Sequence, residues 1–472
     1  MLAVRVIALG IALVLTSLAS FDSLAAADCR RPDPGSPRTL VLALDGIPLR
    51  VVEEARRQGA FQGWPDTLPL VSTFPSMTNV AFTAMLQPFG AKPARGYEVQ
   101  YFDSQRNRVV GRSPFRYHDR VFAWRDLFDY IGRSFLGKVK IYGRPMKLTR
   151  QEVEEAAEVL LHSPKEVILA HVGGTDALVH TKGDEPPVRF LLELDERLKA
   201  LKDEHQQRRG RPLRIILLSD HGNTREKVRR APGIERRLKD AGLRLRGRLE
   251  EPNDVVAATF GVVSYGALFL SPERAETAAR AVARSTAVEA VAWMSAEREA
   301  RVISHRGEAV ILWRDLPEGR RFAYVFDGSE PLGFATVRAA LEDSGHLDAE
   351  GFGSAADWFA AGVGTDYPGA LRRLVDGLTA DYVESRATVL FSLEPGYAWG
   401  WKSAHVAARL KGGRLEGTHG GLDRESSLAF FLSDDPALGN GAPMHVTEAL
   451  VQIAGLEPCE PESLLSPARG SE

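Results

Sequence analysis

Cysteine is almost absent from this chain, because its 472 residues contain only two, Cys29 and Cys459. A fold stapled by many disulfides is therefore excluded. Neither cysteine has a histidine or a second cysteine at metal-ligand spacing. In an oxidising compartment the two could pair and join the ends of the chain, but two unpaired thiols fit the sequence equally well. Any catalytic or metal-binding chemistry must come from other residue types.

An excess of charge of either sign is also missing. The 60 basic residues oppose 62 acidic ones, which leaves a formal net charge of -2. Proteins that bind nucleic acid or anionic membranes usually carry a basic excess, so the composition gives no nucleic-acid-binding signature. The basic stretch from Arg225 to Arg248 is interpreted as a solvated helix face and loop, with attraction of phosphate as the minor alternative.

Long apolar runs are absent except near the start of the chain. There Arg5 precedes an apolar stretch from Val6 to Leu18, and three alanines precede Asp28, as in a secretory signal. The stretch is shorter than the roughly 20 residues of a membrane-spanning helix. We therefore predict a signal peptide over residues 1–27, a periplasmic or secreted protein, and no stable membrane span after cleavage. An uncleaved membrane anchor is the alternative.

The remaining composition, 44% hydrophobic and 26% charged, is that of a globular protein large enough for a sizeable core and a second lobe. Strand-like and helix-like patterns alternate through the first half. Strands are predicted over 39–44, 139–142, 167–171 and 213–218, and helices over 49–58, 150–162 after Thr149 as N-cap, and 187–201. This alternation predicts an α/β fold, layered around a mostly parallel central sheet.

Past about residue 255 the pattern changes to short β-like runs. Strands are predicted over 261–270, 288–294, 309–314 and 321–326, and helices over 273–284 and 335–342. We interpret residues 256–364 as an inserted smaller α+β lobe. The α/β pattern resumes around 368–378, continues over 388–392 and 427–432, and ends with a closing helix over 445–454. The metal-binding core is thus predicted to be discontinuous, comprising residues 38–255 and 365–460.

Two acidic residues follow predicted strands directly. Asp45 comes after the first strand, and Asp220 and His221 come after the strand over 213–218. Open α/β sheets bind ligands at the carboxyl ends of their parallel strands, so we expect these side chains to lie together. For Asp45 alone, a turn-forming role before Gly46 is the alternative.

Two further segments offer metal ligands. Asp176 and His180 are four residues apart, which places them on one face if the segment is helical, but glycines on both sides favour a loop. His419 lies between glycines, which permit close approach to a ligand or form an ordinary flexible loop. Carboxylates and imidazoles suit zinc, with manganese or iron as alternatives. His171 ends a predicted strand and is interpreted as a hydrogen-bonded structural histidine.

Thr78 is the candidate nucleophile. It precedes a predicted helix over 79–86, so its structural alternative is an N-cap. The same position has catalytic potential, because backbone N–H groups at a helix N-terminus stabilise phosphate and a cation can activate a hydroxyl. Ser72 and Ser76 are the competing hydroxyls.

These motifs resemble those of the alkaline phosphatase superfamily, and within it the type I phosphodiesterase/nucleotide pyrophosphatase branch. Residues 74–78 (FPSMT) resemble the nucleophile segment, and 219–222 (SDHG) and 417–420 (GTHG) match metal-binding segments. Residues 176–183 resemble a further segment but lack its glycine before the histidine, and 394–397 (EPGY) resemble a stretch that often precedes the last motif. The resemblance implies an alkaline-phosphatase-like α/β core and is weakest over about 255–365.

The resemblance also implies a two-metal mechanism with two divalent ions, zinc or alternatively manganese. Thr78 would attack phosphorus to form a phosphothreonine, which water would then cleave, while backbone N–H groups near Asn79 would bind the phosphoryl oxygens. The implied ligands of one metal are Asp45, Asp220, His221 and the Thr78 oxygen, and those of the other are Asp176, His180 and His419.

The chain departs from its nucleotide-cleaving relatives where they carry an asparagine that contacts the phosphoryl group, and here Gln100 and Asn107 are the nearest amides. Nucleotide specificity therefore stays open. We predict an exported metal-dependent hydrolase that acts on small-molecule phosphate esters, of the phosphodiesterase or nucleotide pyrophosphatase type. The alternatives are a phosphomonoesterase, phosphonate hydrolase or phosphotransferase with the same site, or a noncatalytic binding protein that retains the fold.

Overall fold

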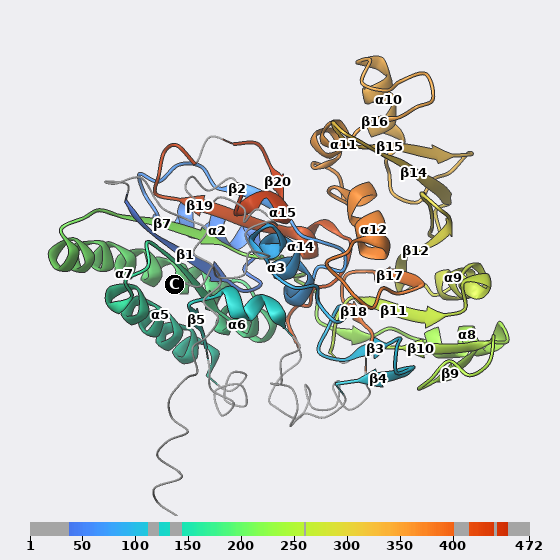
Figure 1. The fold of residues 1–472 in the computed structure, drawn as a ribbon, viewed down its shortest axis with the longest axis horizontal. Helices are drawn as coiled ribbons and strands as arrows, with labels where there is room; N and C mark the ends of the chain where they lie inside the picture. The colour runs from blue at the N-terminus through green and yellow to red at the C-terminus, as the bar shows by residue number, and fades with distance from the viewer. Residues whose placement is uncertain are drawn as a thin grey trace, which may run out of the picture.

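The computed structural model describes residues 37–111, 122–132, 144–258, 261–400, 415–438 and 441–451 (Figure 1). The predicted signal peptide, both cysteines and the predicted strand over 139–142 lie outside these residues. Within the described ranges, no helix has both the length and the apolar character needed to cross a membrane.

A seven-stranded sheet, at the left of Figure 1, forms the α/β part of the molecule. Its neighbouring strands are parallel except where β19 pairs with β2 and β7, which agrees with the predicted mostly parallel sheet. The strands, in spatial order, are β20 (Met444–His445), β2 (Leu68–Val71), β19 (Leu428–Ser433), β7 (Leu213–Leu218), β1 (Arg38–Leu44), β6 (Val167–Val172) and β5 (Tyr130–Ile131).

Helices cover both faces of this sheet. Successive side chains of a strand point to opposite faces, and in β1 Leu40 and Leu42 pack into one core while Val41 and Ala43 pack into another. The first core contains α2 (Leu49–Arg57), α5 (Pro145–His162) and α7 (Glu185–Arg209). The second contains α3 (Thr78–Leu86), η3 (Ala123–Leu127) and α15 (Val446–Ala449). The layers are thus helix, sheet and helix.

A nine-stranded sheet lies at the right of Figure 1 and is antiparallel except between β9 and β10. Its strands, in spatial order, are β16 (Gly353–Ser354), β15 (Gly319–Phe326), β14 (Glu308–Leu316), β13 (Glu299–Ile303), β12 (Val288–Ala296), β17 (Val389–Leu393), β11 (Tyr265–Leu270), β10 (Asp254–Ala257) and β9 (Arg244–Arg246). Its helices are α8 (Ile234–Asp240), α9 (Ala275–Ala283), α10 (Ala335–Asp343), α11 (Ala355–Gly362) and α12 (Ala370–Thr379).

One strand lies elsewhere than the sequence predicted. The run over 388–392 was expected to return to the α/β core, but β17 pairs with β11 and β12 in the middle of the nine-stranded sheet. Antiparallel pairing with strands about 100 residues earlier is a long-range contact that local periodicity does not encode. The second sheet therefore takes strands from both sides of residues 256–364.

The helices next to the site also differ from expectation. Asp176 lies in a helix, α6 (Gly174–Lys182), where a loop was favoured. Gly174 is needed for packing, because a Cβ there would lie 2.5 Å from Thr149 Oγ1. Thr149 is not the N-cap of α5 but lies inside it, and its hydroxyl donates to Pro145 O at 2.9 Å. Gly174, one of the glycines that favoured a loop, instead lets α6 approach α5 closely.

Candidate metal centre

Three neighbouring parallel strands place most of the predicted ligands. β7, β1 and β6 are adjacent and point the same way, so their carboxyl ends share one edge of the sheet. Asp45 follows β1 directly, Asp220 comes two residues after β7, and α6 starts two residues after β6. Asp45, Asp220 and the α6 residues therefore meet because of strand order and direction.

The antiparallel strand β19 brings the other two segments to the same edge. Because β19 runs opposite to β7, the loop before it, which contains His419, reaches the carboxyl end of β7. β2 is antiparallel to β19 and so runs with β7, and the segment after β2 leads directly to Thr78. A hydrogen bond of 2.9 Å from Ser72 N to Ser427 O joins these two segments.

The first predicted ligand group converges around Thr78. Its Oγ1 donates to Asp45 Oδ1 at 3.1 Å and lies 3.1 Å from His221 Nε2. His221 Nε2 also lies 3.3 Å from Asp220 Oδ2. The other oxygen of Asp220 accepts the Gly46 N–H at 3.1 Å. The four side chains expected around one cation thus surround a common point.

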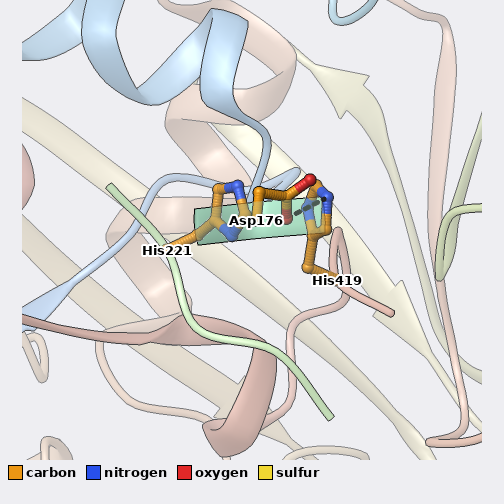
Figure 2. Close-up of side chains that lie close together, drawn as sticks. All are labelled: Asp176, His221 and His419. Carbon is orange, nitrogen blue, oxygen red and sulfur yellow. Dashed lines mark ion pairs between the residues drawn. The ribbon is translucent and has the colours of Figure 1, made fainter. Parts of the chain in front are cut away.

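The second group lies beside the first. Asp176 Oδ1 is 3.2 Å from His180 Nε2 and 3.8 Å from His419 Nε2. Figure 2 shows Asp176 beside His419 and His221, whose rings stack with centroids 3.8 Å apart. Donor atoms of Asp176, His221 and His419 all lie within 4.8 Å of one another. His221, expected in the first group only, therefore borders both.

Each of the three site histidines is fixed by a backbone carbonyl. Nδ1 of His180 lies 2.7 Å from Gly417 O, Nδ1 of His221 lies 2.8 Å from Gly222 O, and Nδ1 of His419 lies 2.8 Å from Ser76 O. A carbonyl oxygen can only accept, so in each neutral ring the proton lies on Nδ1 and the Nε2 lone pair faces the carboxylates. Hydrogen bonds of this kind, made by the ring nitrogen that does not face the metal, orient metal-binding histidines.

The buried carboxylates also fit a cation. Oδ1 of Asp176 and Oδ2 of Asp220 are buried and, among the described residues, accept no hydrogen bond. Burial raises the pKa of Asp45 well above its ordinary value, and the carboxylates of Asp220 and Asp176 raise it further. Burial also opposes ionisation of Asp176, but His180 and His419 hold its pKa below the ordinary value. A divalent cation would relieve this repulsion and bind the open oxygens.

Gly46 leaves room at the centre of the cluster. Its φ of 64° is in the left-handed region, and a Cβ there would lie 2.6 Å from Asp176 Oδ1 and 3.1 Å from His221 Cε1. A side chain at this position would therefore occupy the space between the two ligand groups, in addition to straining the backbone.

Thr78 is the first residue of α3, and Met77 is its N-cap without a side-chain cap bond. The first helical bond runs from Ala81 N to Met77 O, so the N–H of Asn79 precedes it. The Asn79 side chain is buried and donates to Gly96 O at 2.7 Å. A substrate contact from Asn79, as predicted, would therefore come from its backbone N–H.

The competing hydroxyls have other surroundings. Ser76 Oγ donates to Gly421 O at 2.9 Å and accepts from Arg373 at 3.0 Å. Ser72 is fully buried. The amide of Asn107, one of the two considered as a phosphate contact, binds the backbone of Leu249 through bonds of 2.8 and 2.9 Å. Among the described hydroxyls considered, Thr78 alone contacts the predicted ligands.

No protein-family model matches the chain, and a search of curated proteins found no match. Solved structures match over most of the chain. Murine ectonucleotide pyrophosphatase/phosphodiesterase 5 is 11% identical, with 91% of this chain and 98% of that chain covered and a TM-score of 0.45. The human protein is 12% identical, with 87% and 92% covered and a TM-score of 0.44. Phosphonoacetate hydrolase from Sinorhizobium meliloti 1021 is 13% identical, with 89% and 95% covered and a TM-score of 0.48.

The identities to these solved structures are 11 to 13% and the TM-scores are below 0.5, so function has to be inferred from the site residues.

His171, interpreted from the sequence as a structural histidine, lies beside the first ligand group. Its Nε2 lies 3.3 Å from Asp45 Oδ2, the oxygen that does not face Thr78. Its ring lies against Phe82, Trp124 and Phe128, with centroid distances of 5.3 to 5.8 Å. The sequence feature that could have indicated this contact is the position of His171 at the end of the strand beside β1, where β6 pairs in register with Ala43 and Leu44.

Proposed function

We propose that this protein is an exported, metal-dependent hydrolase of small-molecule phosphate esters that uses Thr78 as its nucleophile. The observation that carries the proposal is the orientation of three histidine Nε2 lone pairs and three carboxylates, those of Asp45 and Asp220 buried and that of Asp176 partly buried, toward the space beside one hydroxyl. A noncatalytic binding protein has no need for a hydroxyl among metal ligands at the start of a helix.

Two divalent cations would fit the site. The first would be held by Asp45, Asp220, His221 and Thr78, and the second by Asp176, His180 and His419. When bound, such ions lower the pKa of a coordinated hydroxyl and neutralise charge on the phosphoryl group and the leaving oxygen. Zinc suits this mixture of carboxylates and imidazoles, with manganese as the alternative.

The side chains supply the steps of the reaction. Thr78 Oγ1, held by Asp45 and His221, attacks phosphorus in line with the leaving oxygen, and the bond from phosphorus to that oxygen breaks. The N–H groups of Asn79 and Val80 in the first turn of α3 donate to the nonbridging oxygens. Water then attacks the phosphothreonine, which releases the phosphate product and restores the Thr78 hydroxyl.

A substrate panel tests this proposal. The protein, treated with chelator and then supplied with zinc or manganese, is assayed with an aryl phosphodiester, a phosphomonoester, a phosphonate and a sulfate ester. We expect metal-dependent cleavage of phosphate esters, with diesters preferred. Phosphonate cleavage, or transfer to an alcohol acceptor in place of water, would indicate the corresponding alternative activity. Absence of turnover with a fully metallated sample would contradict the proposal.

A further inference from the structure

Arg373 connects the two halves of the proposed site without belonging to either ligand group. It lies on α12 and is among the largest fully buried side chains of the described residues. We propose that Arg373 is a positioning residue that fixes the distance between Thr78 and His419. This inference rests on the proposed function, because it gives Arg373 a role in the reaction of that same site.

The guanidinium group bridges two loops. Its Nη2 donates to Thr73 O at 3.1 Å and to Ser76 Oγ at 3.0 Å, both in the segment before Thr78. Its Nη1 donates to Leu422 O at 2.9 Å, in the segment after His419. One planar fork therefore binds two segments that are more than 300 residues apart in the sequence.

These two segments also bind each other next to the site. Ser76 O accepts from His419 Nδ1 at 2.8 Å, and Ser76 N donates to Gly420 O at 3.3 Å. Ser76 Oγ, which accepts from Arg373, donates to Gly421 O at 2.9 Å. Ser76 is thus in contact with Arg373 and with the backbone or ring of three residues around His419, and Thr78 lies only two residues further on.

Buried acids complete the arrangement. Burial lowers the pKa of Arg373 to about 9, even though Asp423 and Glu289 oppose this shift. Glu289 accepts from Ser392 Oγ at 2.7 Å, and Ser392 Oγ in turn accepts the N–H of Leu422 at 2.8 Å. Glu289 therefore also reaches the segment after His419 through Ser392, and Asp423 belongs to that segment. A simple hydrophobic filler at position 373 would hold neither loop.

Arg373→Lys tests the role of the planar fork, because lysine keeps the charge but cannot make the same divergent hydrogen bonds. At saturating zinc, we expect kcat for the best substrate to fall at least about tenfold, while KM changes less than about threefold. The distance between the metals provides a readout independent of activity. In samples loaded with two Mn²⁺ ions, electron paramagnetic resonance should show an altered exchange coupling in the variant.

Arg38→Lys is the matched control. Arg38 is also buried and donates to three backbone carbonyls, those of Leu160, Ser163 and Lys165, but it lies at the amino end of β1, the end opposite Asp45. The Arg38→Lys variant should have a lower melting temperature, with kcat and the exchange coupling unchanged. A folded Arg373→Lys variant with wild-type kcat and wild-type coupling would overturn the inference.

If Arg373→Lys does not fold, Ser76→Ala tests the positioning role of Arg373 instead. This change removes the hydroxyl shared by Arg373 and Gly421 at a smaller packing cost, and it should alter kcat and the exchange coupling in the same direction. Wild-type values for Ser76→Ala would then overturn the inference. A wild-type protein that binds no metal pair or cleaves no ester would instead contradict the proposed function, whatever the variants show.

Discussion

Replacing Thr78 by alanine removes the proposed nucleophile and little else. The hydroxyl donates to Asp45 and lies 3.1 Å from His221 Nε2, and loss of a hydrogen bond of this kind costs about 1 kcal/mol of stability. Thr78 is not the N-cap of α3, and alanine is a better helix former by roughly 0.5 kcal/mol. We therefore expect the free energy of unfolding to change by no more than about 1 kcal/mol.

The same substitution should reduce activity far more than it reduces stability. Asp45, Asp220 and His221 remain in place, so metal content should be retained. Loss of the nucleophile should lower kcat/KM at least about 10⁴-fold, which corresponds to about 5.5 kcal/mol of transition-state stabilisation. Thr78→Ser keeps a hydroxyl and should retain measurable turnover.

The assay compares kcat/KM, metal content by mass spectrometry and urea unfolding for wild type and variants after reconstitution with zinc. Thr83→Ala is the matched control, since Thr83 is a buried threonine of the same helix whose hydroxyl donates to Asn79 O. It should keep wild-type kcat. Turnover of Thr78→Ala within about tenfold of wild type would refute the role of Thr78 as nucleophile.

Three further changes test other parts of the account. His419→Ala should lower metal content from two ions to about one and slow hydrolysis of the phosphothreonine, and full metal content would remove His419 from the ligand set. His171→Phe keeps the aromatic packing but loses the contact with Asp45, so zinc affinity should fall about 10- to 100-fold; unchanged affinity would contradict this role. Burial holds the pKa of His445 well below its ordinary value, and the nearby Arg372 and Arg373 lower it further. His445 therefore stays neutral in the folded state, whereas in the unfolded state it gains a proton below about pH 6.5. Stability of the zinc-free protein should therefore fall as pH decreases below that value, by up to about 1.4 kcal/mol per pH unit from this group, and urea unfolding of His445→Gln should show a smaller slope; an equal slope would contradict it.

The sequence predicted the strands that carry the site because their signals are local. β1 and β7 are largely apolar runs, an acidic residue follows each within two positions, and the structure has them at 38–44 and 213–218. Parallel strand direction then required Asp45 and Asp220 to share one edge. The place of β17 could not be predicted in this way, since its partners β11 and β12 are about 100 residues distant.

The residues that contact the predicted ligands also could not be predicted from local sequence patterns. Arg373 binds Thr73 across 300 positions of sequence, and nothing in its own segment distinguishes it from a surface arginine of an amphipathic helix. His171 contacts Asp45 only because β6 pairs with β1 in one particular register. Residue types and strand ends can be predicted from the sequence, whereas the residues that contact the predicted ligands depend on how distant segments pack.

The number of divalent ions bound per chain tests the central claim most directly. The protein, stripped with chelator and titrated with zinc under equilibrium dialysis, should bind two ions tightly, and phosphate ester cleavage should appear only as the sites fill. A folded sample that binds no zinc, or that cleaves esters equally well without it, would contradict the account.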